Sequence, residues 1–408
     1  MRVSSQTWIK GMQTMLLGNV FAQLLPLLAL PIVTRIYSPE NFGVYGLFLA
    51  VFGVFASVAC LRFEFAILQA PDLTRAGDIF WGAVLCALLL SVATLIAAIF
   101  LVDNNLYGLG WMLLLIPPAL FIHGLVQAIT YLLNRERQYK AIVGIRIIQS
   151  SLGLIFILLF SQINLTTQGL ILGHVGGLIG ALFFGYFMVR SMVKAIDFKR
   201  TSSELYNFSG FALFSSPGAL LNNASTSAPL FFVQSYHGAN SVGLMNIVNR
   251  YVGSPLNLVS SSMSQVLHQM IAANEFDDLP KEVLRISAVL AGMGLVLIIS
   301  VYFLGDELVL TLLGPSWADA VEVLKILVIS LSVRFVVSPL SCVLLLDRFL
   351  DRLFKWQLLS LIVTLSVFAI FADLSFLDLL AVYVFADVFL YAIYYVLILF
   401  AAKELRGY

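Results

Sequence analysis

Charged residues are scarce in this chain, and so are features that would indicate a soluble protein. Asp, Glu, Lys and Arg make up 11% of its 408 residues, while apolar residues make up 61%. Soluble domains carry roughly 45–50% apolar residues, so a water-soluble core is excluded. The loops between the apolar runs are each under about 20 residues, too short for a separate domain of at least roughly 50 residues. Any activity must therefore reside among helices.

Motifs for common enzyme chemistry are missing as well. The chain has no GxxxxGK[ST] phosphate loop, no GxSxG or HExxH motif and no loop cluster of carboxylates for glycosyl chemistry. Cys60, Cys86 and Cys342 lie inside apolar runs without CxxC spacing, which is typical of packing residues. The histidines are isolated, and a net charge of +1 gives no basic patch. We expect no enzyme activity, no metal, no cofactor and no nucleic-acid partner.

Long apolar runs are abundant instead. A membrane-spanning helix needs about 20 apolar residues. Twelve runs fit, at 11–34, 42–61, 79–102, 107–133, 141–160, 167–189, 208–235, 242–272, 286–305, 320–346, 356–372 and 379–401. The first is longer than the apolar core of a signal peptide and lacks a small-residue cleavage site, so we expect a retained helix. The sequence predicts an all-α, polytopic membrane protein with twelve transmembrane helices.

Lys and Arg gather in every second connection between these runs. The basic connections hold Arg75; Arg135, Arg137, Lys140 and Arg146; Arg190, Lys194, Lys199 and Arg200; Lys281 and Arg285; and Arg348, Arg352 and Lys355. Both terminal segments are basic too, whereas the alternate connections hold only Arg35. By the positive-inside rule, both termini and the basic connections are cytoplasmic.

The polar connection from Arg190 to Glu204 lies at the midpoint of the chain. It predicts two six-helix lobes, 1–190 and 206–408, joined by a cytoplasmic linker at 191–205. Because each lobe has an even number of helices, a repeat between them would be parallel. A weak echo fits this: Tyr37, Phe42, Gly43 and Val44 follow the first run much as Tyr236, Val242, Gly243 and Leu244 follow the seventh.

Polar side chains form stripes on two predicted helices. At about 100° per residue, those of the eighth fall within roughly 80° of one another. They are Asn246, Arg250, Ser254, Asn257, Ser261, Ser264 and His268. On the seventh, Ser209, Ser216, Asn223, Ser227 and Gln234 also share a face. A single polar residue usually joins neighbouring membrane helices, but a stripe at every depth predicts a face lining an aqueous path.

Outside the basic connections, five basic residues remain: Arg35, which we place at an interface, and Arg62, Arg250, Lys325 and Arg334, which lie in or next to the runs. We take Glu64 and Asp387 as the acids at membrane depth. A central arginine costs at least roughly 2.5–3.5 kcal/mol, so each needs a partner or water. Two residues of separation place Arg62 and Glu64 on nearly opposite helix faces. Arg250, on the stripe, is the first candidate for binding an anionic substrate, Arg62 is the second, and Arg334 pairs with Asp387 in the alternative reading. Glu64, Asp387 and His268 are candidates for ion coupling, with structural pairing equally open for the acids.

Several segments, in this order, resemble a known family. Residues 34–45, TRIYSPENFGVY, resemble its TRLYSPEEFGLY turn, and Leu61–Glu64 with Ala66 and Ile67 resembles its LRYE.AI segment. Ser215–Pro217, Leu221–Asn223, Gly243–Leu244, Arg250–Tyr251 and Pro255–Leu256 follow its seventh and eighth helices, and Leu313–Trp317 follows its GxxW loop. The family is the polysaccharide biosynthesis flippases, the Wzx-type branch of the multidrug/oligosaccharidyl-lipid/polysaccharide exporter superfamily. Phe63 and Phe65 depart from its Tyr and polar residue, leaving Arg62 in more apolar surroundings.

This resemblance implies two six-helix bundles forming a V around a central cavity, lined by helices one, two, seven and eight. It implies alternating access that moves an undecaprenyl-pyrophosphate-linked oligosaccharide from the cytoplasmic to the periplasmic leaflet of the bacterial inner membrane. Membrane lipid and polysaccharide assembly proteins, such as a polymerase and a chain-length regulator, are the implied partners. The expected substrate-binding residues are Arg62, Arg250, Asn19, Gln23, Asn223, Asn246 and Asn257.

Two other functions stay open. A drug or cation antiporter of the same superfamily would concentrate acids in its cavity, whereas basic residues outnumber acids inside these runs. An O-antigen polymerase or ligase, an enzyme, usually carries a long periplasmic loop with arginines. The longest periplasmic loop expected here, 305–319, contains none.

Overall fold

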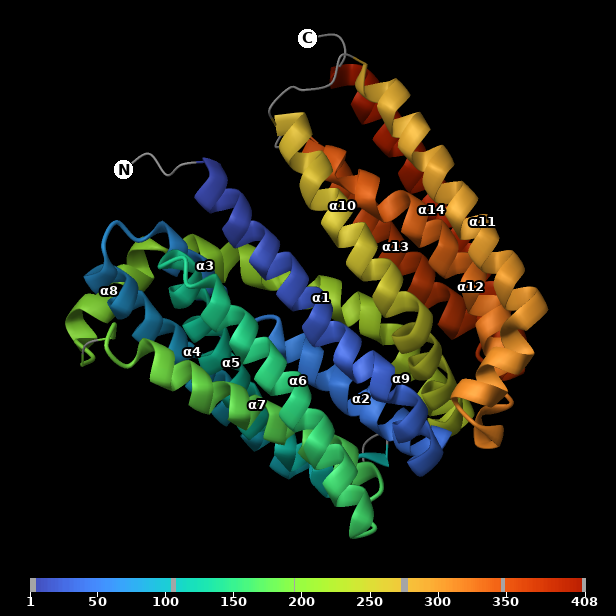
Figure 1. Ribbon diagram of the computed structural model, residues 1–408, viewed down its shortest axis with the longest axis horizontal. Coiled ribbons are helices and arrows are strands. Elements are labelled where there is room, and N and C mark those ends of the chain that lie inside the picture. Colours follow the sequence, from blue (N-terminus) through green and yellow to red (C-terminus); the bar gives the residue numbers. More distant parts are fainter. Residues whose placement is uncertain (1–4, 104–107, 194, 273–277, 346–348, 406–408) are drawn as a thin grey trace. The chain divides into compact units, whose positions relative to one another are not determined.

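The structure is a computed structural model that describes residues 5–103, 108–193, 195–272, 278–345 and 349–405. Its regular elements are helices throughout these ranges (Figure 1). Nine of the described helices are long and apolar enough to cross a membrane. This confirms the predicted all-α polytopic class. The predicted spans 11–34, 208–235 and 242–272 are helical but fall outside the nine. Polar residues lower the apolar content of the last two.

By contacts, the chain divides into two units. Unit 1 comprises residues 1–37 and 44–230, and unit 2 comprises residues 38–43 and 231–408. The predicted lobes with a linker at 191–205 stay a prediction. By contacts, the boundary between the two units lies later in the chain, between residues 230 and 231. Part of the predicted linker is a helix packed on unit 1. Glu204 pairs with Arg75 at 2.9 Å, and Leu205 lies against Gly82.

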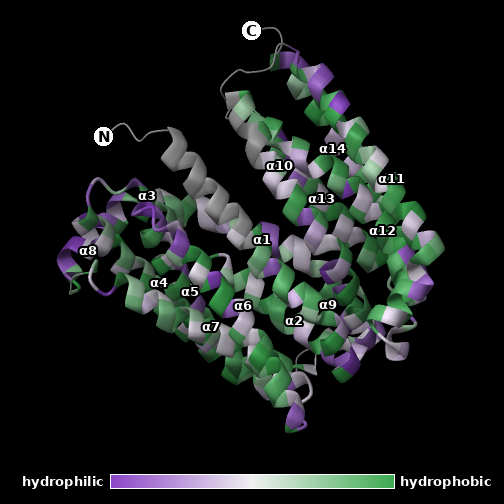
Figure 2. Ribbon diagram, viewed as in Figure 1, coloured by the Kyte–Doolittle hydropathy of each residue, from purple (hydrophilic) through white to green (hydrophobic). Residues whose placement is uncertain are grey.

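Unit 1 is a helical bundle with short connections. Its elements are α1 (Ser5–Ile36), most of α2 (Pro39–Ala56), α3 (Phe63–Gln69), α4 (Leu73–Val102), the 3-10 helix η2 (Gly110–Leu115), α5 (Ile116–Arg135), α6 (Tyr139–Gln162), α7 (Thr167–Val189), α8 (Phe198–Asn207), the π-helix η3 (Phe211–Ser215) and the first part of α9 (Ser216–Val248). Its core lies between α3, α4, α5, α6 and α7. Hydrophilic residues colour α8 purple in Figure 2, and Asp197 caps its first turn by accepting from the Lys199 and Arg200 amides.

Unit 2 begins with the first turn of α2 and resumes within α9. Its further elements are the π-helix η4 (Asn249–Gly253), α10 (Ser254–Ala272), α11 (Leu279–Leu312), the 3-10 helix η5 (Pro315–Trp317), α12 (Ala320–Val337), the 3-10 helix η6 (Ser338–Leu345), α13 (Leu350–Ile370) and α14 (Phe376–Leu405). Gly238, at φ 79°, turns the chain inside α9 between the predicted seventh and eighth spans. Only glycine adopts this backbone conformation readily.

The first turn of α2 meets α9 backbone to backbone within unit 2. A Cβ on Gly43 would overlap the Ala239 carbonyl oxygen, and a Cβ on Gly243 would overlap the Pro39 carbonyl oxygen. The contact is reciprocal, because each glycine faces the residue four positions before the other. Small residues at this spacing allow membrane helices to approach closely. The echo between the two sequence segments therefore corresponds to a pair of facing helix turns.

Residues 34–45 are anchored at several points. In unit 1, the Tyr37 hydroxyl donates to the Ile157 carbonyl at 2.8 Å, and burial raises the pKa of Tyr37 to about 12. In unit 2, Phe42 packs edge-on against Trp317 with ring centroids 5.3 Å apart, and both side chains are buried. The family-like turn and the GxxW-like loop, distant in sequence, are thus in direct contact.

The glycine contact gives a test of the fold. Gly43→Ala and Gly243→Ala should each lower the free energy of unfolding by about 1–3 kcal/mol, because the methyl group meets a backbone carbonyl that cannot rotate away. Gly53→Ala, on the same α2 helix with open space around its Cβ, should be neutral or slightly stabilising. Thermal unfolding of the detergent-purified variants measures this. Equal melting temperatures for all three would contradict the close contact.

Candidate functional site

The candidate residues are distributed over both units, so each set is described within its own unit. Unit 1 holds Arg62, Glu64, Gln23 and Asn223, and unit 2 holds Asn246, Arg250, Asn257 and Asp387. The side chains of Asn19 and His268 lie outside the described part of the chain.

Arg62 sits at a break in the helical backbone. α2 ends at Ala56, and before α3 begins, Leu61 and Arg62 adopt positive φ values of 45° and 63°. A left-handed conformation is uncommon for residues with a Cβ and often marks a functional position. The Arg62 guanidinium lies 5.1 Å from the Phe65 ring centroid, which suits a cation–π contact. Phe65 in turn packs edge-on against Tyr131 at 5.1 Å. Phe65, which stands where the resembled family has a polar residue, therefore provides an aromatic platform for Arg62.

Glu64 is buried inside unit 1. It is 1% exposed, and the Gln127 side-chain amide donates to its Oε1 at 2.9 Å. Its Oε2 is buried without a hydrogen-bond partner among the described residues. Glu64 and Arg62 form no ion pair in that part of the chain. Arg62 precedes α3 in a left-handed conformation, so the helix spacing used to place the two residues on opposite faces does not apply to it. A role for Glu64 in ion coupling stays a prediction.

The polar residues of α9 in unit 1 bond mainly to their own helix. The Asn223 amide donates to the Ala219 carbonyl at 3.0 Å, and Ser225 and Thr226 bond back to preceding carbonyls. Asn223 and Ser227 are half-buried and Ser216 is buried, so this stripe is largely covered. Gln23, on α1, is exposed.

The stripe of unit 2 begins with a short hydrogen-bond relay, which runs from the contact between α2 and α9 through Asn246 to Arg250. The Asn246 amide donates to the Phe42 carbonyl at 3.2 Å, and its Oδ1 accepts from Arg250 Nε at 3.4 Å. Both side chains are half-buried. Further along, Ser254, Asn257 and Ser261 are exposed on α10. Arg250 is thus connected through Asn246 to the contact between α2 and α9, and the polar residues after it are exposed.

Two π-helical segments, η3 and η4, are features that sequence reasoning missed. Each is followed by Ser-Pro, at Ser216–Pro217 and at Ser254–Pro255. In each case the serine hydroxyl bonds to the carbonyl five residues earlier, at 3.3 Å to Phe211 and 3.4 Å to Asn249. A proline removes one donor and crowds the preceding turn, and a wider π turn accommodates it. The recurring Ser-Pro pair was the sequence signal that could have predicted these segments. Because a π turn is wider, the 100° per residue used to place the polar stripe does not hold across residues 249–253.

Arg334 and Asp387 form an ion pair in unit 2. Arg334 Nη2 lies 2.7 Å from Asp387 Oδ1, and Nε donates to Oδ2 at 2.8 Å. Ser330 donates to the same carboxylate at 2.5 Å, and Nη2 also donates to the Tyr383 hydroxyl at 2.9 Å. The structural alternative for this pair therefore matches the geometry, and ion coupling by Asp387 stays a prediction. Lys325 likewise meets Asp306 at 3.1 Å.

His, Cys, Asp and Glu are the side chains that could bind a metal ion. Within the described ranges, no cluster of three or more is close enough to hold an ion.

Comparisons with known proteins give a consistent result. A family model described as polysaccharide biosynthesis protein matches residues 32–322. The teichuronic acid biosynthesis protein TuaB of Bacillus subtilis is 22% identical over 348 residues, covering 82% of this chain and 71% of that protein. The succinoglycan biosynthesis transport protein ExoT of Rhizobium meliloti is 24% identical over 369 residues, covering 85% and 70%.

Solved structures share the fold. An inward-facing multidrug resistance MATE family transporter of the MOP superfamily superposes with a TM-score of 0.74 at 15% identity, covering 94% of this chain and 96% of its own. A MOP superfamily transporter from Pyrococcus furiosus, reported with a binding pocket of reverse polarity, gives 0.66 at 16% identity, covering 96% and 94%. At this identity the likeness concerns the fold alone.

The Arg334–Asp387 pair gives a prediction about stability. Arg334→Ala should cost about 3 kcal/mol, the lower end of the usual range for a broken buried pair, since the Arg334 side chain is 35% exposed. The double variant Arg334→Met with Asp387→Leu should recover much of this loss, because no charge is left without a partner. Detergent melting temperatures and membrane yield measure both. An Arg334→Ala protein as stable as the parent would show that the pair is not structural.

Proposed function

The chain belongs to the family of polysaccharide biosynthesis proteins, and from this premise we propose that it is a flippase for undecaprenyl-pyrophosphate-linked oligosaccharide repeat units. It is a multi-pass membrane transporter of the MOP fold and not an enzyme. The proposed reaction moves the repeat unit from the cytoplasmic to the periplasmic leaflet by alternating access. The V-shaped central cavity that the family resemblance implies is part of this proposal. So are the inner-membrane location and assembly partners such as a polymerase and a chain-length regulator.

The observation that carries the proposal is the Asn246–Arg250 relay with the exposed polar residues after it. A lipid-linked pyrophosphate presents several anionic oxygens followed by many sugar hydroxyls. Arginine's planar fork matches phosphate oxygens, and Ser254, Asn257 and Ser261 offer donors and acceptors to hydroxyls. Arg62, held against Phe65, is the second candidate for the anionic group. Asn223 and Gln23, with Asn19, are proposed to contact the saccharide.

The antiporter alternative has less support. The matching family is described as polysaccharide biosynthesis protein. Cation exchange also needs carboxylates that can contact the cation. Asp387 is bound by Arg334 and Ser330, and Glu64 is buried against Gln127. Two carboxylates proposed for coupling are thus engaged by neighbouring side chains among the described residues, which gives the antiporter alternative less support than an anionic substrate.

Arg250 provides the direct test. Arg250→Ala should fold nearly as well as the parent, because Asn246 keeps its bond to the Phe42 carbonyl. Export of surface polysaccharide should fall about tenfold or more, as expected when a charge-assisted bond worth roughly 1.5–3 kcal/mol is lost. Arg250→Lys should retain part of the activity, since the charge stays and the fork is lost.

The matched control is Arg285→Ala, which removes an exposed arginine from the same unit. It should leave both protein level and export unchanged. A well-expressed Arg250→Ala protein that exports normally would exclude a role for Arg250 in the path. Loss of the protein itself would assign Arg250 to structure.

The proposed orientation has its own test. On a background lacking Cys60, Cys86 and Cys342, a cysteine at Asn240 should react with an impermeant thiol reagent in intact cells. One at Ser202 should react only after the cells are permeabilised, because it lies in the basic, cytoplasmic segment. Both positions are exposed. Equal labelling of the two in intact cells would refute the orientation.

A further inference from the structure

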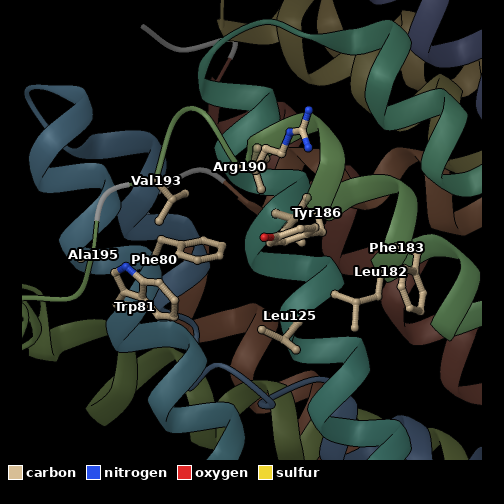
Figure 3. A pocket seen from close by; sticks show the side chains of 11 residues that line it. Phe80, Trp81, Leu125, Leu182, Phe183, Tyr186, Arg190, Val193 and Ala195 are labelled. Atoms are coloured by element: carbon tan, nitrogen blue, oxygen red, sulfur yellow. The ribbon is translucent and has the colours of Figure 1, made fainter.

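An apolar groove runs between α4, α5 and α7 of unit 1, outside the residues discussed above. Its volume is about 560 Å³, within the range of small-molecule sites. Phe80 and Trp81 come from α4, Leu125 from α5, and Leu182, Phe183 and Tyr186 from α7 (Figure 3). All three helices are among those long and apolar enough to cross a membrane.

The groove opens where the protein surface is itself apolar. Phe183 and Tyr186 line it and are 63% and 58% exposed. Exposed aromatic side chains on a membrane-spanning helix face lipid, with tyrosine favoured near the headgroups. Hydrocarbon chains are therefore the medium that meets the open side of the groove.

Among the described lining residues, one is charged and lies at the end of this groove. Arg190 follows the last residue of α7, and its guanidinium lies 5.4 Å from the Phe187 ring centroid. In the described part of the chain it forms no ion pair, whereas Arg75 and Arg200 nearby each meet a carboxylate at 2.9 Å. An arginine beside an apolar groove at a membrane surface matches the phosphate of a lipid whose chain enters that groove.

A second hollow extends from the same place. It has a volume of about 340 Å³ and shares Trp81 and Ala195 with the groove. Thr74, Asp78, Asp197 and Arg200 contribute polar atoms to it, and Arg200 pairs with Asp197. It provides room for a polar headgroup beyond the phosphate, with oxygens that accept from headgroup hydroxyls.

We propose that this groove binds an anionic membrane phospholipid, with an acyl chain between α4 and α7 and the phosphate at Arg190. The cytoplasmic leaflet, where the positive-inside rule places this end of α7, carries anionic lipid. The site is separate from the polar stripes and does not depend on which glycan the protein transports.

Native mass spectrometry of the full-length protein tests this with phosphatidylglycerol and phosphatidylcholine of identical acyl chains. The parent should bind phosphatidylglycerol about tenfold more tightly. Arg190→Ala should reduce its affinity to the phosphatidylcholine level, because the preference comes from one charge-assisted contact. Lys140→Ala, which removes an exposed positive charge on the same predicted side, should keep the preference. Leu182→Trp, which fills the groove, should weaken binding of both lipids.

A second measurement does not depend on the packing of that variant. Phosphatidylglycerol with brominated chains should quench fluorescence in the parent, and the quenched fraction should drop in Trp81→Phe. Several results would overturn the proposal: equal affinity of the parent for both lipids, an unchanged preference in Arg190→Ala, or quenching that Trp81→Phe leaves intact. Glycerol phosphate binding as tightly as the lipid would show a phosphate site without a chain site. A polyprenyl phosphate that displaces phosphatidylglycerol at a tenth of its concentration would assign the groove to a prenyl lipid.

Discussion

The close approach of two backbones at Gly43 and Gly243 is the constraint on which the unit 2 stripe depends. Each glycine faces a carbonyl of the opposite helix turn, so the two turns are fixed in both distance and register. That register brings the Phe42 carbonyl to the Asn246 amide, and Asn246 in turn meets Arg250. It also seats the Phe42 ring against Trp317. The position of Arg250, the proposed substrate-binding arginine, thus depends on Gly43 and Gly243 having no side chain.

The cost of placing charge among apolar helices explains how the other ionisable residues are arranged. Arg334 and Asp387 offset that cost with two parallel bonds, and Ser330 and Tyr383 satisfy further donors and acceptors. Arg62 instead lies over an aromatic ring, which attracts a cation without neutralising it. A guanidinium held in this way retains donors for an anionic solute. This difference is why we propose Arg62, and not Arg334, as a second binding residue.

The sequence predicted much of this fold because a bilayer leaves few solutions for a chain with long apolar runs. Helix positions followed from run length, and the Arg334–Asp387 pair followed as an alternative from the scarcity of acids. Other features could not be predicted, because they depend on local backbone geometry and tertiary packing. The spacing of apolar and polar residues along the sequence carries no information on either. Arg62 adopts a left-handed conformation, and Glu204 ties the predicted linker to Arg75. Phe208 and Phe211, which follow the predicted linker, also pack on the unit 1 core.

The two π-helical segments show why a polar stripe and a helix defect occur together. Each Ser-Pro step deprives the preceding turn of an amide donor, and the serine hydroxyl adds a second bond to the carbonyl five residues earlier, which already accepts from the serine amide. In lipid, such a defect is tolerated only where neighbouring protein or water satisfies the remaining backbone groups. The η4 segment contains Arg250 and precedes the exposed Ser254, Asn257 and Ser261. A backbone that needs polar surroundings and side chains that provide them thus occupy the same part of the helix, which favours a hydrated face there over contact with lipid.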